Sequence, residues 1–401
     1  AITTSHALNI AGGSEFSKFS TGIGYQYQDG IVGNVVKSDF RRFTFRLNSE
    51  HVLYRKGDMD VVKFGENVYF QHRQNQGISI GDQYGNSIST ALRANPAIPI
   101  YNANGDYFMY DDLKNSGTEG WLNYNPFSSN PIVQMMNTAT GNNKSKSFNL
   151  NAVAYLEVQP IKDLVYRGQV AYKQYANMYK EYNGVYKLND QGDQRDQSQL
   201  SENMTIGWNW AVTNTLSYKF DVKDEHHFDV LLGTEYSREG NDMGETLEGM
   251  ALNSVFSDFS HAYFDNFASR AGSATVGGYP VTDHSILSYF GRVNYDYKEK
   301  YMFTAIMRAD GSSNFAKGHR WGYFPSFSAG WVISNENFME STRDWLDFLK
   351  LRVSWGQNGN ENIGAFGYLA AFSFGDLGLY SFNNNKNSGT QGGYPTRLSN
   401  T

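Results

Sequence analysis

Apolar and polar residues alternate with period two along the whole chain. Between residues 349 and 355, Leu349, Leu351, Val353 and Trp355 fall on one side of an extended chain and polar residues fall on the other. Successive side chains of a strand point to opposite faces, so this pattern predicts strands with one apolar and one polar face. The apolar face needs either a protein core or lipid as its surroundings.

About twelve segments follow this template. The clearest lie at residues 42–48, 148–159, 206–220, 287–297 and 349–355. Several exceed the five or six residues usual for globular strands and reach the roughly 9–11 residues that cross a bilayer at a tilt. No run of eighteen apolar residues exists, so we expect no transmembrane helix.

Short turns alternate with long polar segments between these strands. The short turns lie at residues 12–15, 54–59, 158–163, 221–226 and 297–300. The long segments lie at residues 74–145, 179–202, 240–283 and 359–401. This asymmetry is typical of a transmembrane antiparallel β-barrel. A soluble sandwich or propeller is the alternative, but long connections and the lack of a fixed repeat disfavour it.

Composition supports an all-β protein. The 401 residues include 28 Tyr, 27 Phe and 40 Gly but only 8 Pro, and aromatic residues favour strands while Gly favours turns. There is no Cys, which excludes disulfides and thiolate chemistry. The net charge of −6 is spread without a basic stripe, so nucleic acid is not an expected partner.

No catalytic constellation is visible, because HExxH, GxSxG and P-loop patterns are all absent. We therefore expect no enzyme activity, no cofactor and no metal site. His226 and His227 lie at a predicted turn, which favours a solvated rim. Asp190, Asp193 and Asp196 cluster without EF-hand spacing, so a solvated loop is the default and loose calcium binding stays open.

Four stretches carry a family resemblance. They are residues 295–339 (YDYKEKYMFTAIMRADGSSNFAKGHRWGYFPSFSAGWVISNENFM), 345–364 (WLDFLKLRVSWGQNGNENIG), 6–33 (HALNIAGGSEFSKFSTGIGYQYQDGIVG) and 91–107 (ALRANPAIPIYNANGDY). Taken in order along the chain, they resemble the barrel of the SusC/RagA family of TonB-dependent outer-membrane transporters. The resemblance implies part of a plugged barrel of about 22 strands. Residues 1–401 would supply about twelve of these strands. The first strand here matches the family's second, so the chain would end in an outer loop after roughly the thirteenth strand of the family barrel.

The resemblance also implies what lies elsewhere in the complete protein. The chain opens without the charged start and apolar run of a signal peptide, so we expect a piece of something longer. The N-terminal extension, the TonB-contacting segment, the plug and the C-terminal strands of the family would lie outside these residues. An open sheet could not sit in lipid, because its edges would leave unpaired backbone groups there.

On the family's barrel, apolar faces meet lipid and polar faces line the lumen. The expected lumen-facing cations are Arg42, Arg46, Arg292, Lys350 and Arg352. The expected girdle at the membrane–water boundary, where a ring is buried and its polar atom stays wet, consists of Tyr301, Trp321, Tyr323, Trp331 and Trp355. A sugar-binding platform is the alternative for Trp321, Tyr323 and Trp331.

Residues 74–145 form the most site-like segment. Aromatic rings mixed with carboxylates and amides suit sugars, and they suit peptides nearly as well. The candidate ligand-binding residues are Tyr107, Tyr110, Asp111, Trp121 and Tyr124. The competing interpretation is a loop that packs on itself, or on a partner, through the same aromatic side chains.

The resemblance implies active import at the cell outer membrane. A SusD-like surface lipoprotein would cap the barrel, and TonB would drive release of an oligosaccharide, or of an oligopeptide, to the interior. No covalent chemistry is involved, and function depends on lumen polarity, loop shape and closure. The alternatives are a passive porin or adhesin barrel and a secreted β-rich glycan-binding protein.

Overall fold

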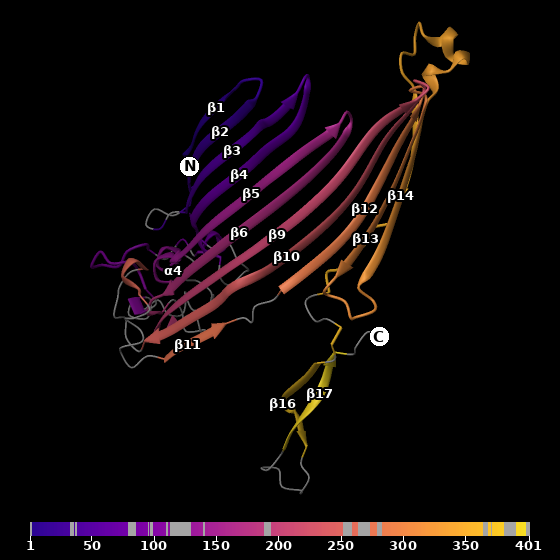
Figure 1. Ribbon diagram of the computed structural model, residues 1–401. Helices are drawn as coiled ribbons and strands as arrows, with labels where there is room; N and C mark the ends of the chain where they lie inside the picture. The colour runs from indigo at the N-terminus through magenta and orange to yellow at the C-terminus, as the bar shows by residue number, and fades with distance from the viewer. Residues whose placement is uncertain are drawn as a thin grey trace.

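The chain folds into one large antiparallel sheet (Figure 1). The computed structural model describes residues 2–32, 36, 38–78, 86–94, 96, 99–109, 111–112, 130–138, 141–187, 194–251, 259–263, 273–278, 283–363, 368–369, 371–380 and 390–397. Among the described residues, no helix is long and apolar enough to cross a membrane.

Each strand of the main sheet pairs with the next one along the chain. Within the described ranges the sheet has thirteen strands, twelve of them in the order β1-β2-β3-β4-β5-β6-β9-β10-β12-β13-β14-β15, and β11 pairs with β10. Their bounds are β1 (Thr3–Gly13), β2 (Ser17–Asp29), β3 (Asp39–Lys56), β4 (Met59–Gln76), β5 (Asn143–Ile161), β6 (Leu164–Asn183), β9 (Ser198–Val222), β10 (His226–Ala251), β11 (Ser273–Gly278), β12 (Asp283–Tyr297), β13 (Tyr301–Ser312), β14 (Trp321–Val332) and β15 (Lys350–Gly356).

Smaller elements lie in the connections and after β15. They are α1 (Ser87–Arg93), α4 (Pro131–Asn137), β7 (Tyr186–Lys187), β8 (Gln194–Arg195), the 3₁₀ helices η1 (Phe259–His261), η2 (Ile333–Asn335) and η3 (Asn337–Thr342), β16 (Ala371–Tyr380) and β17 (Thr390–Arg397). β7 pairs with β8, and β16 pairs with β17, each as a separate two-stranded sheet.

The register separates apolar from polar residues row by row, because directly paired residues of an antiparallel sheet share a face. One row across β15, β14, β13, β12, β10 and β9 is wholly apolar: Trp355, Phe327, Ala305, Val293, Val230 and Tyr218. The neighbouring row, one residue along each strand, is wholly polar: Ser354, Ser328, Thr304, Asn294, Asp229 and Lys219. The sheet therefore has one apolar and one polar face.

No protein core covers the apolar face in the described part of the chain. Leu351, Val353 and Leu232 are 55%, 65% and 60% exposed. The buried hydrophobic residues lie instead at strand ends or in connections: Ile78, Val133, Met135, Tyr182, Leu200, Ala262 and Val332. A continuous, uncovered apolar face is the surface that a membrane barrel presents to lipid.

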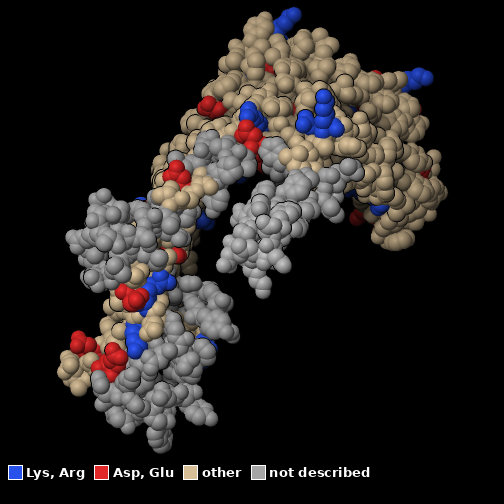
Figure 2. Space-filling view, turned by 90° about the horizontal axis from the view of Figure 1, so that it is seen from below, with Lys and Arg blue, Asp and Glu red and all other residues tan. Residues whose placement is uncertain are grey.

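The sheet is curved, as the wall of a barrel must be. Figure 2 shows Lys, Arg, Asp and Glu gathered along the hollowed side of the molecule. β1 and β15 are the two edges of the main sheet, and neither has a second partner strand among the described residues.

Tight turns join strands at one rim, here called the turn rim, where several residues adopt left-handed backbone. Gly57, Asp163, Lys298 and Glu299 have φ values of 60°, 66°, 55° and 53°. The opposite rim, here called the loop rim, carries the connections that follow β4, β6 and β10. Short connections at one rim and long ones at the other agree with the pattern in the sequence.

Two predicted loops are partly strand. β9 has 25 residues and β10 has 26, and they stay paired from Val222↔His226 to Ser198↔Ala251. The predicted loop at 179–202 therefore loses residues at both ends, to β6 and β9, and the predicted loop at 240–283 loses residues 240–251 to β10. At about 3.3 Å per residue these strands extend far beyond a bilayer. Both faces are wet there, so the alternation that revealed the strands disappears.

The last two connections of the sheet break the rule of short and long loops. Residues 313–320 join β13 to β14 at the loop rim with only a short turn, whereas residues 333–349 join β14 to β15 at the turn rim through η2 and η3. The sequence pattern predicts neither the short turn at the loop rim nor the long connection at the turn rim. Alternation of apolar and polar residues marks strands, and neither connection contains such an alternation.

The face assignment leads to a test on β15. We expect Leu351→Arg or Val353→Arg to cost roughly 2–4 kcal/mol of folding free energy if the position lies near the midplane, because it places a charge on the lipid face. Arg352→Leu should cost little folding free energy, because it changes only the polar face. Heat-modifiable migration on gels measures the assembled fraction. If Arg352→Leu lowers the assembled fraction and Leu351→Arg does not, the two faces of β15 are assigned the wrong way round.

Candidate functional site

The register places all five predicted lumen cations on the polar face of the sheet. Arg42 pairs with Arg73 of β4, Arg46 with Tyr69, Arg292 with Ile306, Arg352 with Gly330 and Lys350 with Val332. Paired residues of neighbouring strands share a face, and following these pairs across the sheet places all five cations on the face that carries Ser354 and Asp229.

Hydrogen bonds and ion pairs satisfy some of the charged side chains on the polar face. Arg42 donates to the Gln26 amide oxygen at 2.7 Å, and the Arg292 guanidinium lies 3.5 Å from the Asp229 carboxylate. Arg352 makes no hydrogen bond or ion pair with any described residue. Some charged side chains of this face therefore have partners within the protein, whereas Arg352 can bond to water or to polar solutes.

Arg308 is the best-connected charge on this face. Its Nε donates to both carboxylate oxygens of Asp310 at 2.8 and 2.9 Å, and Nη2 donates to the Ser288 hydroxyl at 2.9 Å. The Glu235 carboxylate lies 3.7 Å away, and the Phe290 ring lies under the guanidinium at 5.5 Å. Charge-assisted bonds from two nitrogens of one guanidinium to two different side chains fix Arg308 in one geometry.

Beside Arg308 the face is hollowed into a pocket of about 450 Å³. Its walls come from β12, β13, β14, the turn between β13 and β14, and residues 359–361, which follow β15. The lining residues are Ile286, Arg308, Asp310, Ser312, Phe315, His319, Arg320, Trp321, Gly322, Phe324, Gly359, Asn360 and Glu361. Aromatic rings beside both charge signs make this a candidate binding site.

A segment of chain after β15 closes one side of this pocket. The amide of Gln357 donates to the Pro325 carbonyl at 3.0 Å, and the Asn314 amide group donates to the Glu361 carbonyl at 3.4 Å. His284, on β12, lies between two carboxylates: Nδ1 is 3.3 Å from Glu239 and Nε2 is 3.3 Å from Glu361. Residues 357–361 therefore cross the polar face over β14 and reach β12.

Sequence reasoning missed most of this pocket. Of its lining residues, the sequence assigns a role only to Trp321, as a girdle residue. One signal in the sequence is a break in the alternation: Phe324, which lines the pocket, and Phe290, which lies under Arg308, occupy polar-face positions on β14 and β12. The other lining residues lie far apart along the chain, between Ile286 and Glu361, so no local pattern could have joined them.

The long connection between β4 and β5 forms a small folded unit around Asn130. The Asn130 side-chain oxygen accepts from the Ile132 amide at the start of α4, and its amide group donates to the carbonyls of Ile100 and Phe108 at 3.3 and 3.2 Å. One side chain thus caps α4 and holds both arms of the hairpin at residues 100–108.

Two candidate ligand residues are placed in this unit. The Tyr107 ring stacks on Tyr101 with centroids 5.2 Å apart, and loss of water around Tyr107 raises the pKa of its hydroxyl. Asp111 lies 4.0 Å from the Lys187 ammonium. Tyr110, Trp121 and Tyr124 lie outside the described residues, so Tyr107 and Asp111 are the two candidates that the structure places.

The aspartate cluster is placed only in part, since Asp190 and Asp193 also lie outside the described residues. Among the described side chains, no group of three or more His, Cys, Asp or Glu residues could hold a metal ion. His227 Nδ1 instead donates to the Asp221 carboxylate at 2.6 Å, and this hydrogen bond raises the pKa of the imidazole at this exposed turn.

The five predicted girdle residues share the apolar face. Tyr301, Trp331 and Leu351 form one row, and Trp321 begins β14 at the loop rim, ten positions before Trp331 at its end. Ten residues span about 33 Å along a strand, which a tilt of about 40° reduces to about 25 Å. That height matches the apolar band of outer-membrane barrels.

No protein-family model matches the chain. The TonB-dependent receptor SusC of Bacteroides thetaiotaomicron is 31% identical over 410 residues, covering 94% of this chain and 36% of SusC. A TonB-dependent receptor of Formosa agariphila is 28% identical over 361 residues, covering 89% of this chain and 32% of the relative. The chain thus spans about a third of the length of these curated relatives.

Among solved structures, the RagAB peptide importer in its open-open state has a TM-score of 0.76 to this chain at 20% identity. The match covers 99% of this chain and 40% of that one. A second structure of the RagAB peptide transporter gives a TM-score of 0.70 over the same shares. At this identity the likeness shows the fold.

Fold and relatives together define an outer-membrane β-barrel receptor of the TonB-dependent class. Within that class the chain belongs to the SusC/RagA type, and it matches the barrel portion of these proteins. The family, the fold class and the location in the outer membrane are confirmed as the sequence predicted them. The family is one of transporters rather than enzymes, which agrees with the expected lack of enzyme activity.

Asn130 provides a test of the loop-rim unit. We expect Asn130→Ala to destabilise α4 and the hairpin at 100–108 together by about 1–2 kcal/mol, because it removes a helix cap and two bonds to carbonyls. Hydrogen exchange of the amides of Thr138 and Phe108 measures both parts. Asn86→Ala, which removes the cap of α1, is the matched control. Faster exchange in α4 alone would show that Asn130 does not join the two parts.

Proposed function

We propose that the complete protein actively imports an oligomeric nutrient across the outer membrane. A SusD-like surface lipoprotein would cap the loop rim, and TonB would supply the energy through a segment outside this chain. The observation that carries the proposal is the charged polar face with its pocket at the loop rim. Together with the SusC/RagA relationship, it supports a lumen built to contact a polar solute.

The proposal includes how the barrel is completed. β1 and β15 each leave one edge of backbone donors and acceptors without a partner strand among the described residues. Such edges are not tolerated in hydrocarbon, so further strands must pair with them. We place those strands, with the plug and the N-terminal extension of the family, in the remainder of the complete protein. Residues 1–401 then form part of a barrel of about 22 strands.

We propose an oligosaccharide as the substrate and an oligopeptide as the second candidate. Aromatic rings beside amides, carboxylates and arginines can stack on sugar rings and bond to hydroxyl groups, and the pocket presents Phe324 with Arg320, Asn360 and Glu361. The sequence relationship is to SusC, at 31% identity. The peptide alternative has the support of the RagAB peptide importer, at 20% identity.

Import is tested by uptake of labelled oligosaccharides and oligopeptides into cells that express the complete protein. We expect uptake of one class, and its loss when the proton-motive force is collapsed. Uptake that persists without the proton-motive force would indicate a passive porin. Uptake of peptides alone would replace the substrate class while leaving active import in place.

The pocket on the polar face gives a sharper test, because β14 offers a matched pair. We expect Phe324→Ala to weaken uptake by about five- to thirtyfold, the equivalent of about 1–2 kcal/mol of lost contact energy, at normal surface expression. Tyr323→Ala changes the neighbouring residue on the apolar face and should leave the KM of uptake unchanged. If Phe324→Ala and Tyr323→Ala change the KM of uptake equally, the pocket does not contact the substrate.

The long loop between β4 and β5 carries a further prediction. We expect Tyr107→Ala combined with Trp121→Ala to weaken ligand capture or docking of the lipoprotein while barrel assembly stays intact, because long loops on a scaffold vary without disturbing strand register. Growth on the cognate substrate is measured with surface expression in parallel. Normal growth at normal expression would exclude this loop from the site. Lost expression would identify the two aromatic residues as packing residues.

A further inference from the structure

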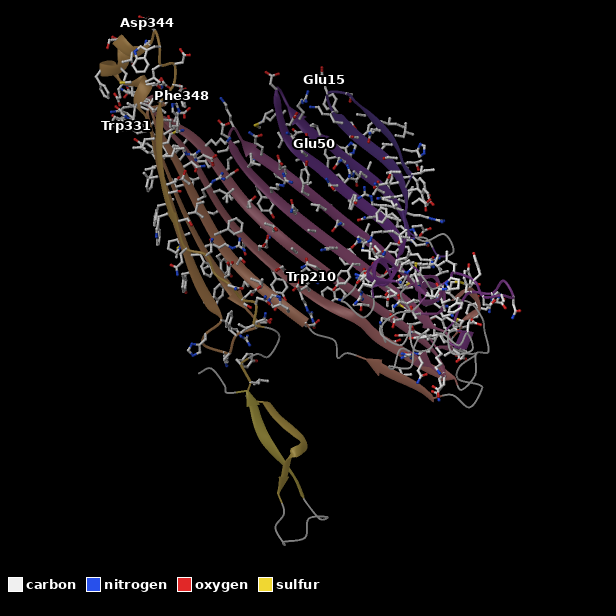
Figure 3. The ribbon with its side chains drawn as sticks, turned by 180° about the vertical axis from the view of Figure 1, so that it is seen from behind. Glu15, Glu50, Trp210, Trp331, Asp344 and Phe348 are labelled. Atoms are coloured by element: carbon white, nitrogen blue, oxygen red, sulfur yellow. The ribbon has the colours of Figure 1, made fainter. Side chains whose placement is uncertain are left out.

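The connection between β14 and β15 exposes three large aromatic side chains at the turn rim. Phe338, Trp345 and Phe348 are 64%, 73% and 64% exposed. Figure 3 shows this connection, with Trp331, Asp344 and Phe348 labelled, beyond the turn-rim ends of the strands. Aromatic rings left in water are unfavourable, so their exposure on an otherwise polar loop needs a physical reason.

The base of this loop is clamped shut. The amide of Ser334 donates to the Leu349 carbonyl at 3.2 Å, which brings the two ends of the loop together. Glu336 accepts from the Tyr301 hydroxyl at 2.6 Å, from the Trp331 indole at 3.1 Å and from the Lys300 ammonium at 3.2 Å. The hydrogen bond from Tyr301 contributes most to lowering the pKa of the Glu336 carboxyl, and the bonds from Trp331 and Lys300 lower it further, so this carboxyl stays ionised.

The clamp fixes the side of the sheet from which the loop departs. Tyr301 and Trp331 lie on the apolar, lipid-facing surface, and Glu336 holds the polar atoms of both. Phe338 then packs edge-on against Trp331 with centroids 6.4 Å apart, and Trp331 stacks on Tyr301 at a similar distance of 6.4 Å. The aromatic row of the lipid face therefore continues without a break into the loop.

The loop has a defined internal shape. The Met339 amide donates to the Glu336 carbonyl at 3.0 Å, and the amides of Trp345 and Leu346 both donate to the Thr342 carbonyl, at 3.1 and 2.9 Å. Backbone groups that bond within the loop can enter a layer that offers fewer water molecules. The exposed rings are therefore presented by a folded turn.

Charge decides what kind of surface the loop can meet. Four carboxylates, those of Glu336, Glu340, Asp344 and Asp347, stand against the single Arg343. This balance disfavours attraction to an anionic surface. The rings must therefore supply the binding, and aromatic side chains favour the boundary between headgroups and acyl chains, where the ring is buried and polar groups stay wet.

We propose that residues 333–349 are an interfacial anchor whose rings, Phe338, Trp345 and Phe348, enter the headgroup layer of the membrane leaflet at the turn rim. The partner is a zwitterionic phospholipid surface. The anchor extends the girdle beyond the strands and holds the β14–β15 edge of the sheet at a fixed depth. It depends on the outer-membrane location of the barrel and not on which substrate is imported.

The test uses the complete transporter in phosphatidylcholine vesicles, with and without bromine on the acyl chains. The fluorescence of Trp345 is obtained as the difference between the native protein and Trp345→Phe. We expect brominated lipid to quench this signal by at least half and dissolved acrylamide to quench it several times less than free indole. A signal that acrylamide quenches as it does free indole, with no effect of bromine, would overturn the proposal and leave the loop free for a protein partner.

A double variant separates anchoring from folding. Phe338→Ser with Phe348→Ser should cut the quenching of Trp345 by brominated lipid by at least half, while heat-modifiable migration remains normal. Unchanged quenching in a normally migrating variant would overturn the role of these two rings. If the variant fails to assemble, the measurement on the native protein still decides the proposal. Neither result depends on uptake, so a failed transport assay stays distinguishable from a failed anchor.

Discussion

The structure depends on one constraint: every strand must separate apolar from polar side chains, and neighbouring strands must keep these faces in register. The rows through Trp355 and Ser354 show this separation across six strands without an exception. A slip of one residue would place Asp229 and Asn294 in lipid, which costs far more than the pairing gains. The apolar solvent outside therefore selects the register of the whole sheet.

The same constraint explains where the barrel can specialise. Lipid fixes the outer face, but the polar face only has to remain wet, so it can hold Arg308 in a bonded cluster, admit Phe290 and Phe324, and open a pocket at the loop rim. Beyond the bilayer both faces are free, which lets β9 and β10 continue as paired strands and the other connections fold into caps, turns and short helices.

Contacts at the two rims connect distant segments that the ladder leaves apart. At the loop rim, Asn130 joins α4 to the hairpin at 100–108, and residues 357–361 return over β14 toward His284. At the turn rim, Glu336 joins β13, β14 and the loop that follows. Each contact is made by a polar side chain with several partners, because isolated polar groups near a membrane carry a high cost of lost hydration.

The sequence alone determined most strands of the sheet, their two faces and the main turns, because lipid imposes a period-two pattern that survives in one dimension. The family came instead from the resemblance of four stretches of the chain, since alternation by itself also fits a soluble β protein. The sequence also placed Arg42, Arg352, Tyr301 and Trp331 on their faces, since alternation assigns faces directly. Only the tertiary structure decided the extensions of β9 and β10, the pocket around Phe324 and Glu361, and the clamp on the β14–β15 loop. These features join residues from several segments at the rims of the sheet, where hydrocarbon no longer imposes a repeating pattern on the chain.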